Sequence, residues 1–381
     1  MWKSFTSVIN MESDAINSLQ SFYYRFRPLT ELTIKELIYD EIFFASTEEC
    51  NDPYDCFPFI VFPPDRDKWG RLLSFAWDDE FAQKYLEDFV EYLCKHGNIS
   101  LKDLMSQDFR FLSKEETIKG DISFFSHVRK LHSCIEAYTF KKKYFASFSK
   151  SCKDYLMWSH YADKHNGICL IFKPIGKGLF QRKDVLRRKF TFKSVQSSVA
   201  NPFIFRDVAY CKQPQTIDGF DSFPADICEK YSFGSEEERI DFLESREKYF
   251  LEKLDCWDYE EEVRLLLPAP AAWVAGKIEL SKNQRLFNYD PTQLAGIIFG
   301  SRTTEEYKKR IIEIVNDKQE RIVRSGDVKG RPNIFMLFQT TMGTSERKLD
   351  FKPIGVNVAG SFLDLDDKNF NGLFNQWGAL Q

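Results

Sequence analysis

The sequence contains no apolar run long enough to cross a membrane. A membrane-spanning helix needs about 18 to 20 successive apolar residues, and polar or charged residues interrupt every apolar stretch sooner. Residues 1–11 lack the basic and then apolar pattern of a secretory leader. The nine cysteines are scattered and include no C-x-x-C pair, which favours reduced thiols. These absences predict a cytoplasmic protein with no membrane partner.

The signatures of common metal and nucleotide sites are absent as well. The five histidines lack H-E-x-x-H spacing, and the chain has neither a Walker loop nor the glycine fingerprint of a Rossmann fold. No metal site is predicted. The 53 basic and 57 acidic residues leave a net charge of −4, so the whole chain neither attracts nor repels a polyanion strongly.

The composition is that of a folded protein. Hydrophobic residues make up 43% of the chain and aromatic residues 16%, far from the composition of disordered proteins. A length of 381 residues allows one large domain with an insertion or two ordinary domains, at roughly 150 residues each. We predict one catalytic-type α/β domain over residues 1–345, with a helical insertion at about 66–140, and a C-terminal tail at 346–381.

Residue periodicity predicts a mixture of strands and helices. Apolar runs and alternation predict strands at residues 22–26, 41–45, 144–148, 168–172, 296–300 and 334–341. Helical spacing predicts helices at residues 31–38, 79–95, 154–165 and 304–316, and a long helix from a capping box at Ser235 and Glu238 to Leu254. The last strand, helix and strand can add a parallel pair to the sheet. The expected fold class is α+β.

Four sequence blocks stand out by their order and spacing. They are Tyr24-Arg25-Phe26, Asn51-Asp52-Pro53, a block from Ser147 through LMWSHYA to Gly167, and Tyr259-Glu260-Glu261-Glu262-Val263-Arg264. Together they resemble a bacterial domain family of unknown function, over most of the chain up to about residue 300. That resemblance implies no reaction.

Three of these motifs are also similar to those of ADP-ribosyltransferases of the arginine, serine, glutamate type. Such enzymes carry an arginine on the first strand, a Ser-x-Ser on a later strand, and a Glu-x-Glu before an apolar strand. The resemblance implies a mixed β-sheet core with the split sheet of that family, and NAD as the substrate. It further implies a macromolecular acceptor, either protein or nucleic acid, and a bacterial toxin or anti-phage effector that an antitoxin could neutralise.

The resemblance also assigns roles to single residues. Glu262 would bind the ribose 2-hydroxyl and stabilise the oxocarbenium-like centre, and Glu260 would orient or deprotonate the acceptor. Ser147 would brace the active site, and Arg25 would hold a phosphate bidentately. The further cofactor-binding candidates are Tyr24, Ser149, His160 and Arg264. On a strand, Glu260, Glu262 and Arg264 would share one face, because residues two apart point the same way.

Other interpretations remain open from the sequence. The preceding helix could continue through residues 259–266, so that Glu260 and Arg264 form an i, i+4 ion pair of about 0.2 to 0.5 kcal/mol on a solvated face. A metal-independent nuclease or hydrolase could use His160 with Glu260 or Glu262 as acid and base. An NAD glycohydrolase and a non-catalytic sensor or binding module are the remaining alternatives. Turn propensity alone explains Asn51-Asp52-Pro53, and Tyr161 is expected to pack inward.

Overall fold

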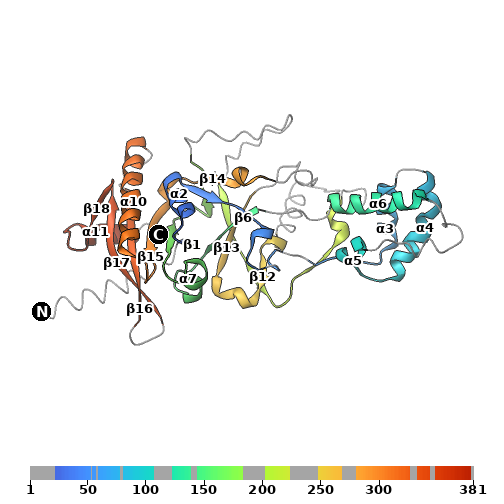
Figure 1. Ribbon diagram of the computed structural model, residues 1–381, viewed down its shortest axis with the longest axis horizontal. Helices are drawn as coiled ribbons and strands as arrows, with labels where there is room; N and C mark the ends of the chain where they lie inside the picture. Colours follow the sequence, from blue (N-terminus) through green and yellow to red (C-terminus); the bar gives the residue numbers. More distant parts are fainter. Residues whose placement is uncertain are drawn as a thin grey trace.

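The computed structural model describes most of the chain. The described residues are 22–52, 54–56, 59–77, 80–106, 122–138, 144–182, 202–223, 248–267, 280–326, 333–343 and 348–378. They form a main body around a large β-sheet and a smaller helical lobe, which lies at the right in Figure 1. The fold is a mixture of helices and strands, so the predicted α+β class is confirmed.

The main sheet is mixed, with strand order β18-β17-β16-β15-β7-β1-β6-β13-β9-β8 and β3 paired to β6. Its strands are β1 (Tyr23–Arg27), β3 (Ala45–Ser46), β6 (Tyr144–Ser149), β7 (Ile168–Phe172), β8 (Gly178–Leu179), β9 (Phe203–Asp207), β13 (Glu262–Leu266), β15 (Leu294–Phe299), β16 (Ile334–Met342), β17 (Leu349–Val358) and β18 (Ser361–Leu363). The predicted strands at 22–26, 144–148 and 168–172 are therefore confirmed within one residue at each end.

Helices cover both faces of this sheet. One face packs against α2 (Glu31–Tyr39) and α10 (Glu305–Ser325), and the other against α7 (Tyr155–Tyr161) and α11 (Phe370–Gly378). The sequence of strand β7 is wholly apolar because both faces of the strand are buried. Its residues alternate between the two hydrophobic cores, and all five are buried.

The predicted parallel pair is confirmed. Strands β15 and β16 run parallel in register, and α10 connects them. Helix α10 begins after Thr304, whose side chain accepts from the Tyr307 amide, but it extends to Ser325 rather than to Asn316. It continues because Ile322 still lies on the buried stripe, and it ends at Gly326, which has φ 69°.

The residues after Leu349 continue the sheet and its cover. Strand β17 pairs with β16 over most of its length, and β18 pairs with β17. Helix α11 then returns to the sheet, where the Trp377 indole donates to the Ala295 carbonyl at 3.0 Å and stacks on Phe22. The sequence predicted no structure for this segment, although Trp377 is fully buried.

Helix α7 ends earlier than the sequence predicted. It stops at Tyr161, and Asp163, Lys164 and His165 follow with φ of 47°, 53° and 71°. The chain then enters β7 at Gly167, whose amide donates to the Ala162 carbonyl at 2.8 Å. A Cβ at Gly167 would lie 2.3 Å from the Arg27 carbonyl oxygen. The backbone of β1 therefore approaches too closely for any other residue here.

Replacing Gly167 by alanine should lower the free energy of unfolding by about 1–3 kcal/mol, because the added methyl group forces two backbones apart. Urea denaturation measures the change. Gly70→Ala in the lobe is the matched control, since a Cβ there meets no atom within 4 Å and alanine is the better helix former. Equal stability of the two variants would contradict the close approach.

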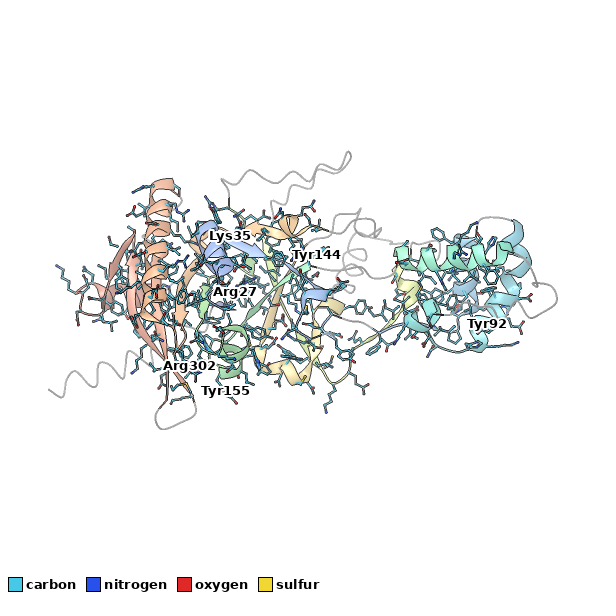
Figure 2. The ribbon with its side chains drawn as sticks, in the orientation of Figure 1. Arg27, Lys35, Tyr92, Tyr144, Tyr155 and Arg302 are labelled. Carbon is cyan, nitrogen blue, oxygen red and sulfur yellow. The ribbon has the colours of Figure 1, made fainter. Side chains whose placement is uncertain are left out.

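The helical lobe has a hydrophobic core of its own, which includes Trp69, Leu72, Phe89, Leu131 and Phe220. Its elements are β4 (Phe59–Phe62), α3 (Arg66–Ala76), α4 (Glu80–Lys95), β5 (Ile99–Ser100), α5 (Leu101–Ser106), α6 (Ile122–Tyr138), β11 (Thr216–Asp218) and η3 (Gly219–Ser222). Figure 2 shows Tyr92 in this lobe and Arg27 and Tyr144 in the main body. The lobe thus combines residues near 59–138 with a second segment near 216–223.

Short elements complete the described chain. They are β2 (Glu41–Phe43) with β14 (Leu286–Asn288), β10 (Ala209–Cys211) with β12 (Glu252–Leu254), η1 (Thr47–Glu49), η5 (Lys248–Phe250), η6 (Asp255–Glu260), η7 (Lys282–Arg285) and η8 (Pro291–Gln293). The long helix predicted from Ser235 to Leu254 is wrong at its end, because Glu252–Leu254 pairs with β10 as a parallel strand. Its start lies outside the described residues.

Candidate functional site

A cavity of about 330 Å³ opens where strands β1 and β6 separate. Among the described residues, these two strands are paired at one position, Tyr24 with Ser149. Further along β6, its neighbour is β3, which pairs with Phe145 and Tyr144. Both separated strands line the cavity, together with residues from the loop after η1, β12, η6 and α7. The volume lies within the usual range of small-molecule sites.

Ser147 stands at the centre of this opening. The Lys150 amide donates to Glu261, and the Leu267 amide donates to Tyr144, so the even-numbered residues of β6 direct their backbone groups toward β13. The odd-numbered residues face the other way. Ser149 meets β1 and Phe145 meets β3, while Ser147 meets no strand on that side within the described chain. Its backbone N–H and C=O therefore point into the cavity.

The acidic motif adopts two backbone conformations. The sequence left open whether residues 259–266 form a strand or a helix. In the structure, Glu260 ends the 3₁₀ helix η6, Glu261 turns through a left-handed conformation with φ 42°, and Glu262 begins β13. Strand β13 pairs with β6 so that Glu262 lies beside Ser149 and Arg264 beside Ser147. The serine and glutamate motifs are thus neighbours in the sheet.

Lys253 brings the two glutamates together despite this turn. Its Nζ lies 2.5 Å from Oε2 of Glu260, 3.2 Å from Oε2 of Glu262 and 3.6 Å from Oδ2 of Asp55. All four side chains are at most 4% exposed. A buried cluster of this kind is stable only when each charge has partners.

Arg264 forms hydrogen bonds with two carboxylates of this cluster, those of Glu262 and Asp55. Its Nε donates to Oε1 of Glu262 at 2.8 Å, and its Nη2 donates to both Asp55 oxygens at 2.8 and 2.7 Å. Its Nη1 donates to Cys56 Sγ and to the Phe250 carbonyl, both at 2.8 Å. The guanidinium is fully buried and does not line the cavity. It is placed to hold Glu262 in position rather than to touch a ligand.

The two glutamates have pKa values that move in opposite directions. Burial raises the pKa of Glu260, and the charge of Glu262 adds to this effect against the opposing effect of Lys253. Burial would also raise the pKa of Glu262, but the charges of Arg264 and Lys253 and a hydrogen bond with Ser147 lower it to about 2. Glu262 is therefore ionised at neutral pH, while Glu260 is the better proton acceptor. Such divergent pairs are typical of acid–base sites.

Tyr161 and Asn51 extend the network toward the cavity mouth. The Tyr161 hydroxyl donates to Oε1 of Glu260 at 2.5 Å, and Nδ2 of Asn51 donates to the Tyr161 oxygen at 3.0 Å. Both residues line the cavity. The inward packing expected for Tyr161 is thus accompanied by a polar contact with the site. The Asn51-Asp52-Pro53 turn, for which a structural interpretation sufficed, contributes a cavity residue.

Arg25 reaches the cavity from β1. Its guanidinium carbon lies 5.3 Å from the centre of the Phe148 ring, and Nη2 donates to the Phe43 carbonyl at 3.4 Å. Nη1 is buried and has no hydrogen-bond partner among the described residues. Burial and then the charge of Arg27 lower the pKa of Arg25 to about 10, so the group stays charged at neutral pH. A buried cation with an unused donor suits an anionic ligand.

The structure brings most of the predicted site residues together. Glu260, Glu262, Ser147, Ser149, Arg25 and Tyr24 all line the cavity. The Ser149 hydroxyl is engaged with the backbone of Ser151, and Tyr24 is 1% exposed within a hydrophobic core. His160 is exposed, lies beside Tyr259 and does not line the cavity. Its predicted contact with a ligand therefore has no support from the geometry.

Sequence reasoning missed Lys253 and Asp55. Lys253 lies in a stretch that was assigned to a helix, and Asp55 follows a turn whose residue types needed no function. Asp55 lies 209 residues before its partner Arg264, which leaves no local signal, whereas Lys253 lies only 7 and 9 residues before Glu260 and Glu262. Within the described ranges, no group of three or more His, Cys, Asp or Glu side chains is arranged to hold a metal ion.

These observations define an α+β protein whose large mixed sheet borders a charged cavity between β1 and β6. A family model described as a protein of unknown function (DUF2971) matches residues 157–265. The matched segment contains Tyr161, Lys253, Glu260, Glu262 and Arg264, whereas Arg25 and Ser147 precede it. The similarity fits the predicted resemblance to a domain family of unknown function. No curated protein and no solved structure matches the chain.

In the part of the chain that the structure describes, no helix combines the length and the apolar character that a membrane span requires.

Proposed function

We propose that the protein is an NAD-dependent ADP-ribosyltransferase. One observation carries the proposal: the cavity between β1 and β6 has the guanidinium of Arg25 on one side, with Nη1 unpartnered among the described residues, and two glutamates of divergent pKa, Glu260 and Glu262, on the other. Dinucleotide phosphates need a fixed cation, and cleavage of a glycosidic bond needs a fixed anion. The cavity offers both.

The chemistry follows from the protonation of the glutamates. Loss of nicotinamide from NAD develops positive charge on the ribosyl C1′, and an ionised carboxylate stabilises that charge without a proton transfer. Glu262, with a pKa of about 2, fits this task. Glu260, whose pKa is raised by burial, fits the removal of a proton from the attacking group.

The backbone of Ser147 supports the same substrate. Its N–H and C=O face the cavity beside each other on one extended residue, as the pairing of β6 implies. A primary carboxamide, such as that of nicotinamide, carries a complementary acceptor and donor. The side chain of Ser147 also bonds to Glu262, which connects the bound amide with the reacting ribose.

The biological setting is part of the proposal. The acceptor is a cellular macromolecule, protein or nucleic acid, and the enzyme acts in the cytoplasm as a toxin or anti-phage effector under the control of a neutralising antitoxin. Incubating the full chain with NAD labelled in its adenine, in cell extract, should release nicotinamide and label a macromolecule. If NAD stays intact with every extract and acceptor tried, the proposed activity is wrong.

Replacing Arg25 by glutamine should raise the KM for NAD by about 10- to 100-fold, which corresponds to the loss of a charged hydrogen bond of about 1.5–3 kcal/mol. Initial rates of nicotinamide release measure the effect. Arg310→Gln is the control, because this exposed arginine pairs with Glu31 far from the cavity. A KM that is unchanged in a folded Arg25 variant would remove Arg25 from the binding site.

A further inference from the structure

Lys253 lies in the cavity wall beside Glu260. Its ammonium group contacts Oε2 of both glutamates, and Lys253 itself lines the cavity. The Trp257 ring lies 5.1 Å from Nζ and covers it from another side. Lys253 is thus held by Glu260, Glu262, Asp55 and Trp257, in a buried position that fixes its charge.

The charges of the cluster sum to one net negative charge. Three carboxylates, those of Asp55, Glu260 and Glu262, face two cations, Lys253 and Arg264. Both oxygens of Glu260 are also in use, since Oε1 accepts from Tyr161 and Oε2 accepts from Lys253. Glu260 therefore offers a remaining lone pair to a hydroxyl proton, while the ammonium of Lys253 already stands against its Oε2.

We infer that the macromolecular group that accepts the ADP-ribosyl moiety is an electrically neutral hydroxyl, and that Lys253 excludes guanidinium and ammonium acceptors. This inference rests on the proposed function and names its substrate class. A cationic acceptor that bonded to Glu260 would share this carboxylate with Lys253 Nζ, and like charges in a partly buried site repel strongly. Specificity would thus arise from a repulsive element as well as from attraction.

The step balances with a neutral acceptor. The C1′–N bond of NAD breaks, and its electron pair leaves with the nicotinamide nitrogen, which becomes neutral. The hydroxyl oxygen forms the new bond to C1′, and its proton passes to the Glu260 carboxylate and then to solvent. The raised pKa of Glu260 supports this transfer. Throughout the step, Lys253 and Arg264 keep Glu262 ionised.

An acceptor competition tests the inference with the unmodified protein. The full chain is given adenine-labelled NAD in water, in water with methanol, and in water with agmatine, whose guanidinium is the cationic probe. We expect ADP-ribose, methyl ADP-ribose in the methanol arm, and transfer to agmatine at least about 100-fold weaker per mole than to methanol. The first two products distinguish water from alcohol as the hydroxyl source.

A variant gives a second measurement. Lys253→Met keeps the length of the side chain but removes its charge, and it should shift the ratio of agmatine to methanol products by at least about 10-fold toward agmatine. Lys150→Met is the control, because Lys150 pairs with Asp207 at the surface and should leave the ratio unchanged. Efficient agmatine labelling by the unmodified protein would overturn the inference and leave the transferase proposal standing. Absence of nicotinamide release in every arm would overturn the transferase proposal itself.

Discussion

Replacing Glu262 by glutamine should lower kcat for nicotinamide release by about 10²- to 10⁴-fold, the range expected when a group that stabilises the transition state is lost. Glutamine keeps the shape of the side chain but removes the charge that we propose to stabilise the ribosyl C1′. The low pKa of Glu262 means that the native group carries this charge at neutral pH. The KM for NAD should change less than kcat, because the charge acts mainly in the transition state.

The neighbouring glutamate supplies the control for this experiment. Glu261 carries the same charge one residue away, but its side chain is exposed and does not line the cavity. Glu261→Gln should therefore retain kcat. Urea denaturation of both variants separates lost catalysis from lost structure. Equal kcat for folded Glu262→Gln and the unmodified protein would exclude Glu262 from the reaction.

Replacing Arg264 by methionine should reduce the free energy of unfolding by about 3–5 kcal/mol, since removal of one partner leaves buried charge without compensation. Without Arg264, the carboxylates of Asp55, Glu260 and Glu262 would face Lys253 alone. The Phe250 carbonyl would also lose the hydrogen bond that Arg264 donates to it. Urea denaturation followed by circular dichroism measures this loss.

The control for Arg264 is an arginine with a surface ion pair. Arg324 contacts Glu320 one turn away on α10 and is 78% exposed, so Arg324→Met should leave the stability nearly unchanged. Arg264→Lys should fall between the two variants, because it retains a charge but cannot reproduce the fork of donors. If Arg264→Met unfolds like the unmodified protein, the cluster does not stabilise the fold.

The sequence predicted the central strands because their local patterns are strong. Tyr144–Ser149 alternates between faces, and Ile168–Phe172 is apolar throughout, and both patterns hold whatever the chain pairs with. The order of the arginine, serine and glutamate motifs likewise pointed to residues that do line one cavity. Local sequence patterns do not determine the register, that is, which residues of two strands pair with each other. The pairing of Glu262 with Ser149 depends on strands more than one hundred residues apart.

The role of Lys253 and the orientation of His160 could not be predicted from the sequence, for physical reasons. Lys253 belongs to a three-residue strand whose partner strand is distant in sequence. Three residues are too few to show the alternation of apolar and polar residues by which a strand is predicted. His160 was placed at the site by its motif, but α7 turns it outward while Tyr161 points inward. On a helix, adjacent residues differ in direction by about 100°. A sequence pattern that correctly predicts that a helix exists can therefore still lead to the wrong one of two adjacent residues.

The opening between β1 and β6 has a consequence for how this cavity could change during evolution. Every residue type except proline carries the same amide and carbonyl groups, so recognition through the backbone at position 147 does not depend on the side chain there. The proposed contact with a carboxamide would therefore persist if the residue at position 147 changed, whereas the hydrogen bond from the Ser147 side chain to Glu262 would be lost. Among the described residues, a strand that lacks a partner at one position thus separates recognition that any residue type can supply from a contact that needs this hydroxyl group.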